Sequence, residues 1–246
     1  MEQKSILIVR GGGDLASGVI HRLYCCGYRV LVLECHKPSA IRRKVSFGEA
    51  VFDGTSAVEG VTGRLISDIA DAEKIWEAKE IPILVDETGE TAKKLKPAAL
   101  IDAILAKKNL GTNRNMASLT VALGPGFEAG KDVDFVIETQ RGHNLGRVIR
   151  KGSATPNTGI PGVIAGYGKE RVIHSPAAGI MHNLSQIGDI VEKDQILARV
   201  DDVPVYASLT GVLRGIIRDG YEVPKGMKIA DIDPRQEQKK NCDTIS

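Results

Sequence analysis

The stretch Ser5–Leu23, SILIVRGGGDLASGVIHRL, decides the expected fold of the first half of the chain. A short apolar run ends at Arg10 and passes into the three glycines Gly11–Gly13, after which apolar residues recur at helical spacing. Gly27 ends that helix, and RVLVL at 29–33 predicts a second buried strand. A strand–helix–strand unit of about 30 residues has the size of a parallel βαβ crossover.

The same alternation continues further along the chain. Strands are expected at 81–86 (IPILVD), 119–123 (LTVAL) and 134–138 (DFVIE), with a helical pattern at 69–79. Alternating strands and helices favour an open, mostly parallel sheet covered by helices. The sequence therefore predicts a Rossmann-like α/β domain over residues 1–168.

The second half has a different texture, with short β runs broken by Gly, Asp and Pro. It contains an internal repeat, because Gly179 and Gly211, and likewise Gly188 and Gly220, lie 32 residues apart. Two matched β units that pack together bury surface that neither could bury alone. We expect a small all-β domain over 169–234, followed by a polar tail at 235–246.

Composition excludes several classes of protein. The 246 residues include 33 Lys and Arg against 31 Asp and Glu, a net charge of only +2, so a strongly basic nucleic-acid binder is not expected. Aromatic residues make up 4% of the chain, too few for a platform that stacks single-stranded bases. No nucleic-acid partner is predicted.

Apolar runs and cysteines point to a cytoplasmic protein. No apolar run approaches the roughly 18 residues that span a bilayer, and the N-terminal run is too short for a signal peptide. The cysteines, Cys25, Cys26, Cys35 and Cys242, have no zinc-type spacing. The adjacent Cys25 and Cys26 are interpreted as buried small hydrophobic residues rather than redox or metal-binding ones. Neither a membrane contact nor a metal site is expected.

A glycine-rich loop carries the main functional hypothesis. Gly11, Gly13 and Ala16 match G-x-G-x-x-G/A between a strand and a helix, and Glu34 ends the next strand 21 residues after Gly13. Such a loop lets backbone N–H groups approach a pyrophosphate at the helix N-terminus, while Glu34 accepts hydrogen bonds from a ribose diol. The predicted cofactor-binding residues around this loop are Gly11, Gly12, Gly13, Asp14, Leu15, Ala16 and Glu34.

Asp14 supports a competing interpretation of the same loop. As an N-cap, its carboxylate would satisfy the N–H groups that a phosphate would otherwise use. The alternative is therefore a tight strand-to-helix turn capped by Asp14, with no nucleotide.

A second polar segment, Gly124–Gly162, follows the strand at 119–123. Loops in this position bind ligands in open α/β sheets, so Gly124 and Gly126 are added to the predicted cofactor site. Glu138, Arg141 and His143 are candidate catalytic residues, because Arg can hold an anion and His can transfer protons near neutral pH. The alternative is a connector whose glycines only make turns.

The C-terminal repeat resembles the biotinyl/lipoyl barrel-sandwich hybrid. The resemblance is carried by HSPAAGIM (174–181), IGDIVEKDQIL (187–197), VYASLTGVL (205–213) and DGYEVPKGMKI (219–229). Carrier domains of this type present a modified lysine on a hairpin tip, but the tip at 199–204 reads RVDDVP. We therefore expect no covalent biotin or lipoate, and a docking or lid role instead.

Taken whole, the chain resembles the YqeB family, accessory proteins of the selenium-dependent molybdenum hydroxylase system. The residues that carry this are VRGGGDLASGVIHRL (9–23), GPGFEAGKDVDFVIETQRGHNLGRVI (124–149) and ATPNTGIPG (154–162). The first half is also similar to the Rossmann domain of XdhC-type proteins. The resemblance implies a role in maturing a molybdenum hydroxylase, which would be the protein partner.

Three functional hypotheses follow. The first is a maturation accessory that binds NAD(P) or a molybdenum cofactor nucleotide at the glycine loop. The second is an NAD-dependent oxidoreductase acting on a small substrate, and the third is a non-enzymatic scaffold that docks a hydroxylase. A homodimer is compatible with such a fold.

Overall fold

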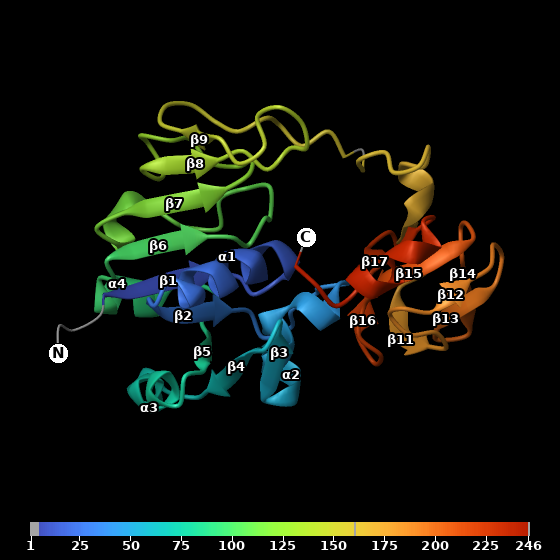
Figure 1. Cartoon of the computed structure of the whole chain (residues 1–246), viewed down its shortest axis with the longest axis horizontal. Helices are drawn as coiled ribbons and strands as arrows, with labels where there is room; N and C mark the ends of the chain where they lie inside the picture. The colour runs from blue at the N-terminus through green and yellow to red at the C-terminus, as the bar shows by residue number, and fades with distance from the viewer. Residues whose placement is uncertain (1–4, 160, 246) are drawn as a thin grey trace. The chain divides into compact units, whose positions relative to one another are not determined.

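The computed structural model describes residues 5–159 and 161–245. The chain divides into two compact units (Figure 1). Unit 1 comprises residues 1–38 and 46–158, and unit 2 comprises residues 39–45 and 159–246. The division differs from the predicted boundaries because the short segment 39–45 belongs with the C-terminal residues, as does the predicted polar tail at 235–246.

Unit 1 is built on a nine-stranded sheet with the order β3-β4-β5-β2-β1-β6-β7-β8-β9. The strands from β4 to β8 in that order pair in parallel, whereas β3 and β9 pair antiparallel at the two edges. Figure 1 shows the arrows of β6, β7 and β8 pointing to the same side. The strands are β1 (Ile6–Arg10), β2 (Arg29–Glu34), β3 (Thr55–Val58), β4 (Val61–Ile66), β5 (Ile81–Val85), β6 (Ala99–Asp102), β7 (Thr120–Leu123), β8 (Phe135–Ile137) and β9 (Val148–Ile149).

Few helices accompany this sheet. They are α1 (Asp14–Cys25), α2 (Ala50–Asp53), α3 (Ala72–Glu77) and α4 (Glu90–Leu95), and residues 103–134 form no α-helix. Among the described residues, no helix is long and apolar enough to cross a membrane.

The predicted Rossmann-like fold class is therefore wrong. The prediction was a mostly parallel sheet covered by helices, whereas the structure has a mixed nine-stranded sheet. A turn at Glu59-Gly60 folds β3 back on β4 at one edge, and the loop 138–147 folds β9 back on β8 at the opposite edge. The connections from β6 to β7 and from β7 to β8 contain no α-helix, so the regular alternation of strand and helix stops after α4.

The core of unit 1 lies against the central strands. Ile8, Leu31 and Leu100 are fully buried in one apolar cluster that also takes in residues of α3 and α4. A separate cluster around Val133 and Val136 buries the loops beside β7 and β8. The continuous apolar runs of β1 and β2 reflect burial on both faces of the sheet.

Unit 2 consists of two four-stranded antiparallel sheets, with the orders β10-β17-β15-β12 and β14-β13-β11-β16. The 32-residue repeat is visible in them: β10 to β13 correspond in order to β14 to β17, and each sheet takes two strands from each repeat. The strands are β10 (Val172–His174), β11 (Gly179–Asn183), β12 (Ile190–Val191), β13 (Ile196–Val200), β14 (Val203–Tyr206), β15 (Gly211–Ile216), β16 (Glu222–Val223) and β17 (Lys228–Asp233).

The predicted all-β barrel-sandwich domain is likewise corrected. Unit 2 is two separate antiparallel sheets that share one apolar core, together with pieces that the prediction left out. Ile41 of the segment 39–45 accepts a backbone hydrogen bond from Ile216 at 2.9 Å. The predicted polar tail forms a 3₁₀ helix at Gln236–Asn241, and Cys242 after it is buried in the core.

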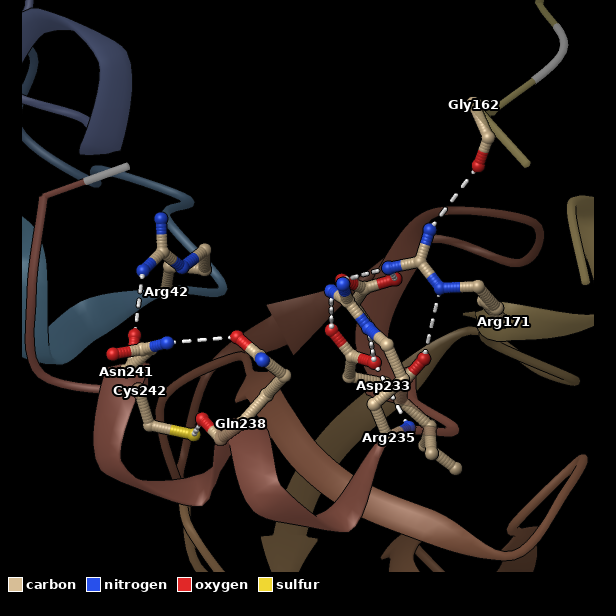
Figure 2. Close-up of polar contacts among 10 residues, drawn as sticks. Arg42, Gly162, Arg171, Asp233, Arg235, Gln238, Asn241 and Cys242 are labelled. Atoms are coloured by element: carbon tan, nitrogen blue, oxygen red, sulfur yellow. Dashed lines mark hydrogen bonds and ion pairs between the residues drawn. The ribbon is translucent and has the colours of Figure 1, made fainter. Parts of the chain in front are cut away.

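A buried ion pair joins Arg171, which ends the 3₁₀ helix Lys169–Arg171 just before β10, to Asp231 of the last strand, β17. Arg171 donates to both carboxylate oxygens of Asp231 at 3.2 and 3.1 Å and to the carbonyl of Ile232 at 3.1 Å. It also donates to the carbonyl of Gly162 at 3.3 Å (Figure 2). Both partners are almost fully buried. Burial raises the pKa of the Asp231 carboxyl, against the lowering effect of the Arg171 charge.

We predict that Arg171→Met alone destabilises unit 2 by about 3–5 kcal/mol, because it leaves the Asp231 carboxylate buried without its cation. The double variant Arg171→Met/Asp231→Asn should recover much of this loss in urea unfolding. The single variant should lose less at pH 5 than at pH 7, since protonation neutralises Asp231. Equal losses in the single and double variants would contradict a stabilising pair.

Candidate functional site

A cavity of about 640 Å³ opens at the carboxyl ends of four parallel strands of unit 1. Its walls come from the ends of β1, β2 and β5 and from the loop after β6. Ligands of open α/β sheets bind at this edge, because several loops meet there. The lining residues are Arg10, Gly11, Leu33, Glu34, Cys35, Asp86, Glu87, Thr88, Glu90, Lys93, Ile104, Leu110 and Gly111.

Glu34 lies in this cavity with its carboxylate held in place by the backbone. Its Oε2 accepts the N–H of Gly12 at 2.6 Å, and its Oε1 accepts the N–H of Cys35 at 2.8 Å. A carboxylate has about four acceptor positions, so two bonds fix its direction and leave acceptor capacity for a ligand. The structure thus places the predicted ribose acceptor in the cavity wall and also joins it to the glycine loop.

The three glycines of the loop have different surroundings. A Cβ on Gly11 would lie 3.0 Å from Ile104 Cα, and one on Gly12 would lie 2.7 Å from the backbone nitrogen of Gly48. A Cβ on Gly13 would have no heavy atom within 4 Å. The first two glycines therefore allow neighbouring backbone to pack closely, and only Gly13 borders open space.

The segment Ser46–Gly48 packs directly against Gly12 of the glycine loop. The Gly12 carbonyl accepts the hydroxyl of Ser46 at 2.8 Å, the N–H of Gly48 at 2.9 Å and the hydroxyl of Ser17 at 3.1 Å. The Gly12 carbonyl is therefore occupied by these three donors, and the Gly12 N–H is occupied by the Glu34 carboxylate. The predicted pyrophosphate contact at Gly12 is thus taken by the protein itself.

The alternative interpretation, in which Asp14 is the N-cap of α1, is not what the structure shows. The N-cap residue is Gly13, and Asp14 is the first helical residue, whose Oδ1 lies 2.9 Å from the N–H of Leu15. Leu15 is 45% exposed, whereas Ala16 is fully buried. Of the predicted loop residues, Gly11 and Glu34 line the cavity, while Ala16 serves helix packing.

Sequence reasoning missed a buried polar network beneath the cavity. Arg10 Nη1 donates to the hydroxyl of Thr112, which donates to Asp102 Oδ2 at 2.6 Å, and Arg10 Nη2 donates to the carbonyl of Glu87 at 2.6 Å. Nη1 lies 3.7 Å from the Asp102 carboxylate. Burial raises the pKa of the Asp102 carboxyl, against the lowering effects of Thr112 and Arg10. The signal in the sequence is a charged residue ending each of the apolar strands β1 and β6.

Cys35 adds a neutral thiol to the cavity wall. Burial raises its pKa to about 12, and the negative charges of Glu34 and Glu87 act in the same direction. At neutral pH the thiol is therefore protonated and is a poor nucleophile. Cys35 thus contributes surface to the cavity rather than covalent chemistry.

Charge in the cavity wall is predominantly negative. Its acidic side chains, Glu34, Asp86, Glu87 and Glu90, outnumber the two basic ones, Arg10 and Lys93, by two. Asp86 caps α4, since its carboxylate accepts the N–H groups of Gly89 and Thr91. Such a wall suits a neutral ligand rich in hydroxyl or amine donors and disfavours a phosphate inside the cavity itself.

The predicted residues of the central segment lie elsewhere along the same edge. Gly124 and Gly126 follow β7 and Glu138 follows β8, and they are not in the cavity wall. A Cβ on Gly124 would lie 2.6 Å from Thr139 Oγ1, and one on Gly126 2.6 Å from Lys108 N. These glycines, like Gly12, make room for neighbouring loops.

The Glu138 carboxylate anchors a loop through hydrogen bonds instead of facing the cavity as a catalytic group. Its carboxylate accepts the N–H of Gln140 at 2.7 Å and both the N–H and the hydroxyl of Thr155 at 2.8 and 2.7 Å. Burial raises its pKa, but these hydrogen bonds outweigh burial and leave the pKa below the usual glutamate value. Arg141 and His143 are exposed in the loop that Glu138 anchors.

Among residues 5–159 and 161–245, no group of three or more His, Cys, Asp or Glu side chains is arranged to hold a metal ion.

No protein-family model matches the chain. The "Uncharacterized protein YqeB" of Escherichia coli K12 is 51% identical over 232 residues, which is 94% of this chain but 43% of that protein. The chain thus spans less than half the length of this curated relative.

Solved structures match only weakly. The ectoine utilization protein EutE (DoeB) of Ruegeria pomeroyi is 11% identical, with 93% of this chain and 86% of that chain covered and a TM-score of 0.29. An aspartoacylase family protein of Mesorhizobium loti is 11% identical, with 94% and 85% covered and a TM-score of 0.29. At such scores these matches assign no activity to the chain.

The family identification made from the sequence is corrected by these findings. It predicted an accessory protein of a molybdenum hydroxylase system, with an XdhC-type Rossmann domain and a barrel-sandwich domain. No family model matches the chain, and the curated relative is described only as an uncharacterized protein, so neither comparison supplies a molybdenum hydroxylase role or an XdhC-type domain. The molybdenum hydroxylase role is therefore not carried forward.

We predict that Gly12→Ala destabilises unit 1 by about 1–3 kcal/mol, because its Cβ must displace the backbone at Gly48. The neighbouring Gly13→Ser is the control: its side chain meets open space, and serine is a favoured N-cap, so stability should stay level or rise. Urea unfolding of both variants without ligand tests the difference. A tolerated Gly12→Ala would show that the loop is not closed by Ser46–Gly48.

Glu138→Gln should lower stability at pH 7 by about 1–3 kcal/mol, since charge-assisted bonds to Gln140 and Thr155 are lost. A folded-state pKa below the unfolded value of about 4.3 contributes stability above that pH, and this contribution disappears as the pH falls through the lower value. Melting temperatures of variant and parent should therefore converge below about pH 4. The exposed Glu128→Gln is the control and should change little at either pH.

Proposed function

We propose that unit 1 binds a small molecule containing a nucleoside, with its ribose hydroxyls on Glu34. The observation that carries this is the Glu34 carboxylate in the cavity wall, held by the N–H groups of Gly12 and Cys35. A carboxylate accepts both hydroxyls of a ribose diol, and one that is already oriented loses little entropy when it does so.

The rest of the cavity supports the same class of ligand. Leu33, Ile104 and Leu110 provide apolar surface for a flat base, and Thr88 with the neighbouring carboxylates provides partners for its amine groups. The volume of about 640 Å³ lies within the range of small-molecule sites. A 2′-phosphate would meet the charge of Glu34, so a ligand with a free 2′-hydroxyl is favoured.

Calorimetric titration with adenosine, 2′-deoxyadenosine, NAD and NADP tests this proposal. Adenosine and NAD should bind. The affinities of 2′-deoxyadenosine and NADP should be lower by a factor of about ten or more. Glu34→Gln should weaken adenosine about 10- to 100-fold, because amide hydrogens replace half of the acceptor capacity and the charge is removed.

The exposed Glu77→Gln is the matched control, since it makes the same chemical change outside the cavity wall and should leave affinity unchanged. Adenosine binding that is insensitive to Glu34→Gln, or no binding by any of these ligands, would refute the proposal.

A further inference from the structure

Four exposed cations lie on the carboxyl edge of the unit 1 sheet, beyond the cavity. Lys107 and Lys108 lie in the loop after β6, and Arg141 and Arg147 lie in the loop between β8 and β9. No ion pair joins any of these four to a carboxylate in the part of the chain that the structure describes. We call these four residues the basic strip.

The strip is continuous with the cavity through closely packed loops. Ile104 lines the cavity, and the next residue, Leu105, would lie 3.2 Å from a Cβ on Gly124. Gly126 approaches the backbone of Lys107 and Lys108, and Gly124 approaches Thr139 at the foot of the β8–β9 loop. Strands β6, β7 and β8 are neighbours and parallel, so the ends of β6 and β8, from which the two loops of the strip start, are about 10 Å apart.

The loop that carries the two arginines is ordered by its own hydrogen bonds. The backbone of Glu138 pairs with Arg147 at 3.0 Å and with Gly146 at 2.8 Å, and its carboxylate is occupied by Gln140 and Thr155. The nearest acidic side chain of this loop is therefore committed to the loop itself. Arg141 and Arg147 remain exposed, with their charges uncompensated by neighbours.

Charge thus divides along the edge. The cavity wall is acidic around β2 and β5, while the edge beyond β6 is basic. A nucleotide has the same division, with a neutral donor-rich nucleoside and an anionic phosphate chain. We infer that the ligand carries a phosphate chain, which is bound by the basic strip of Lys107, Lys108, Arg141 and Arg147. This inference rests on the proposed nucleoside site. Arginine suits this role because its guanidinium donates to two phosphate oxygens at once.

The test compares adenosine, AMP and ADP by calorimetric titration at 50 and 300 mM salt. ADP should bind at least about tenfold more tightly than adenosine at low salt, and the advantage should shrink at high salt because exposed charges are screened. Arg141→Gln/Arg147→Gln and Lys107→Gln/Lys108→Gln should each reduce the ADP advantage severalfold.

The hairpin offers a matched control. Arg150 and Lys151 follow β9, which is antiparallel to β8, so they lie at the opposite edge of the sheet. Arg150→Gln/Lys151→Gln removes the same charge from the same hairpin and should leave the ADP advantage intact. Because Arg150 packs over the Phe135 ring, the melting temperature of this variant is measured alongside.

The outcomes separate the two proposals. If adenosine binds through Glu34 but ADP binds no more tightly, or if the ADP advantage survives both strip variants, the inference about the phosphate chain is overturned and the nucleoside site stands. If ADP binding depends on the strip but not on Glu34, the strip stands and the nucleoside site is overturned. Absence of binding by all three ligands overturns both.

Discussion

The bond between the Glu34 carboxylate and the Gly12 N–H determines how the carboxyl edge of unit 1 is arranged. It joins the end of β2 to the loop after β1, while Ser46–Gly48 closes the other side of Gly12. A side chain at position 12 would break this arrangement, because no space exists beside Gly48. The cavity wall, the direction of Glu34 and the start of α1 all depend on this close approach.

The Gly12 N–H donates to the Glu34 carboxylate, so this N–H of the glycine loop is not available to a bound anion. Here four acidic side chains line the cavity, whereas the basic strip lies further along the same edge. The buried Arg10 is already engaged by Thr112, Asp102 and the Glu87 carbonyl, which makes it part of the cavity floor. Ligand chemistry at this edge follows from that separation of charge.

Much of the strand pattern was predictable. The expected strands at 5–9, 29–33, 81–86 and 119–123 coincide closely with β1, β2, β5 and β7, because strands buried on both faces give continuous apolar runs. Edge hairpins are harder to recognise, since β3 and β9 are short and partly exposed. The 32-residue repeat also predicted matched strands, but not how two sheets share them.

Local features follow from the amino-acid order alone: which segments are strands, where the glycine turn lies, and that Glu34 ends the second strand. What those residues contact depends on the three-dimensional fold. Gly12 meets Gly48, Glu138 meets Thr155, and Arg10 meets Thr112, which are pairs separated by 17 to 102 residues. Local propensity depends on neighbours within a few residues, whereas these contacts arise when strand order brings distant loops to one edge.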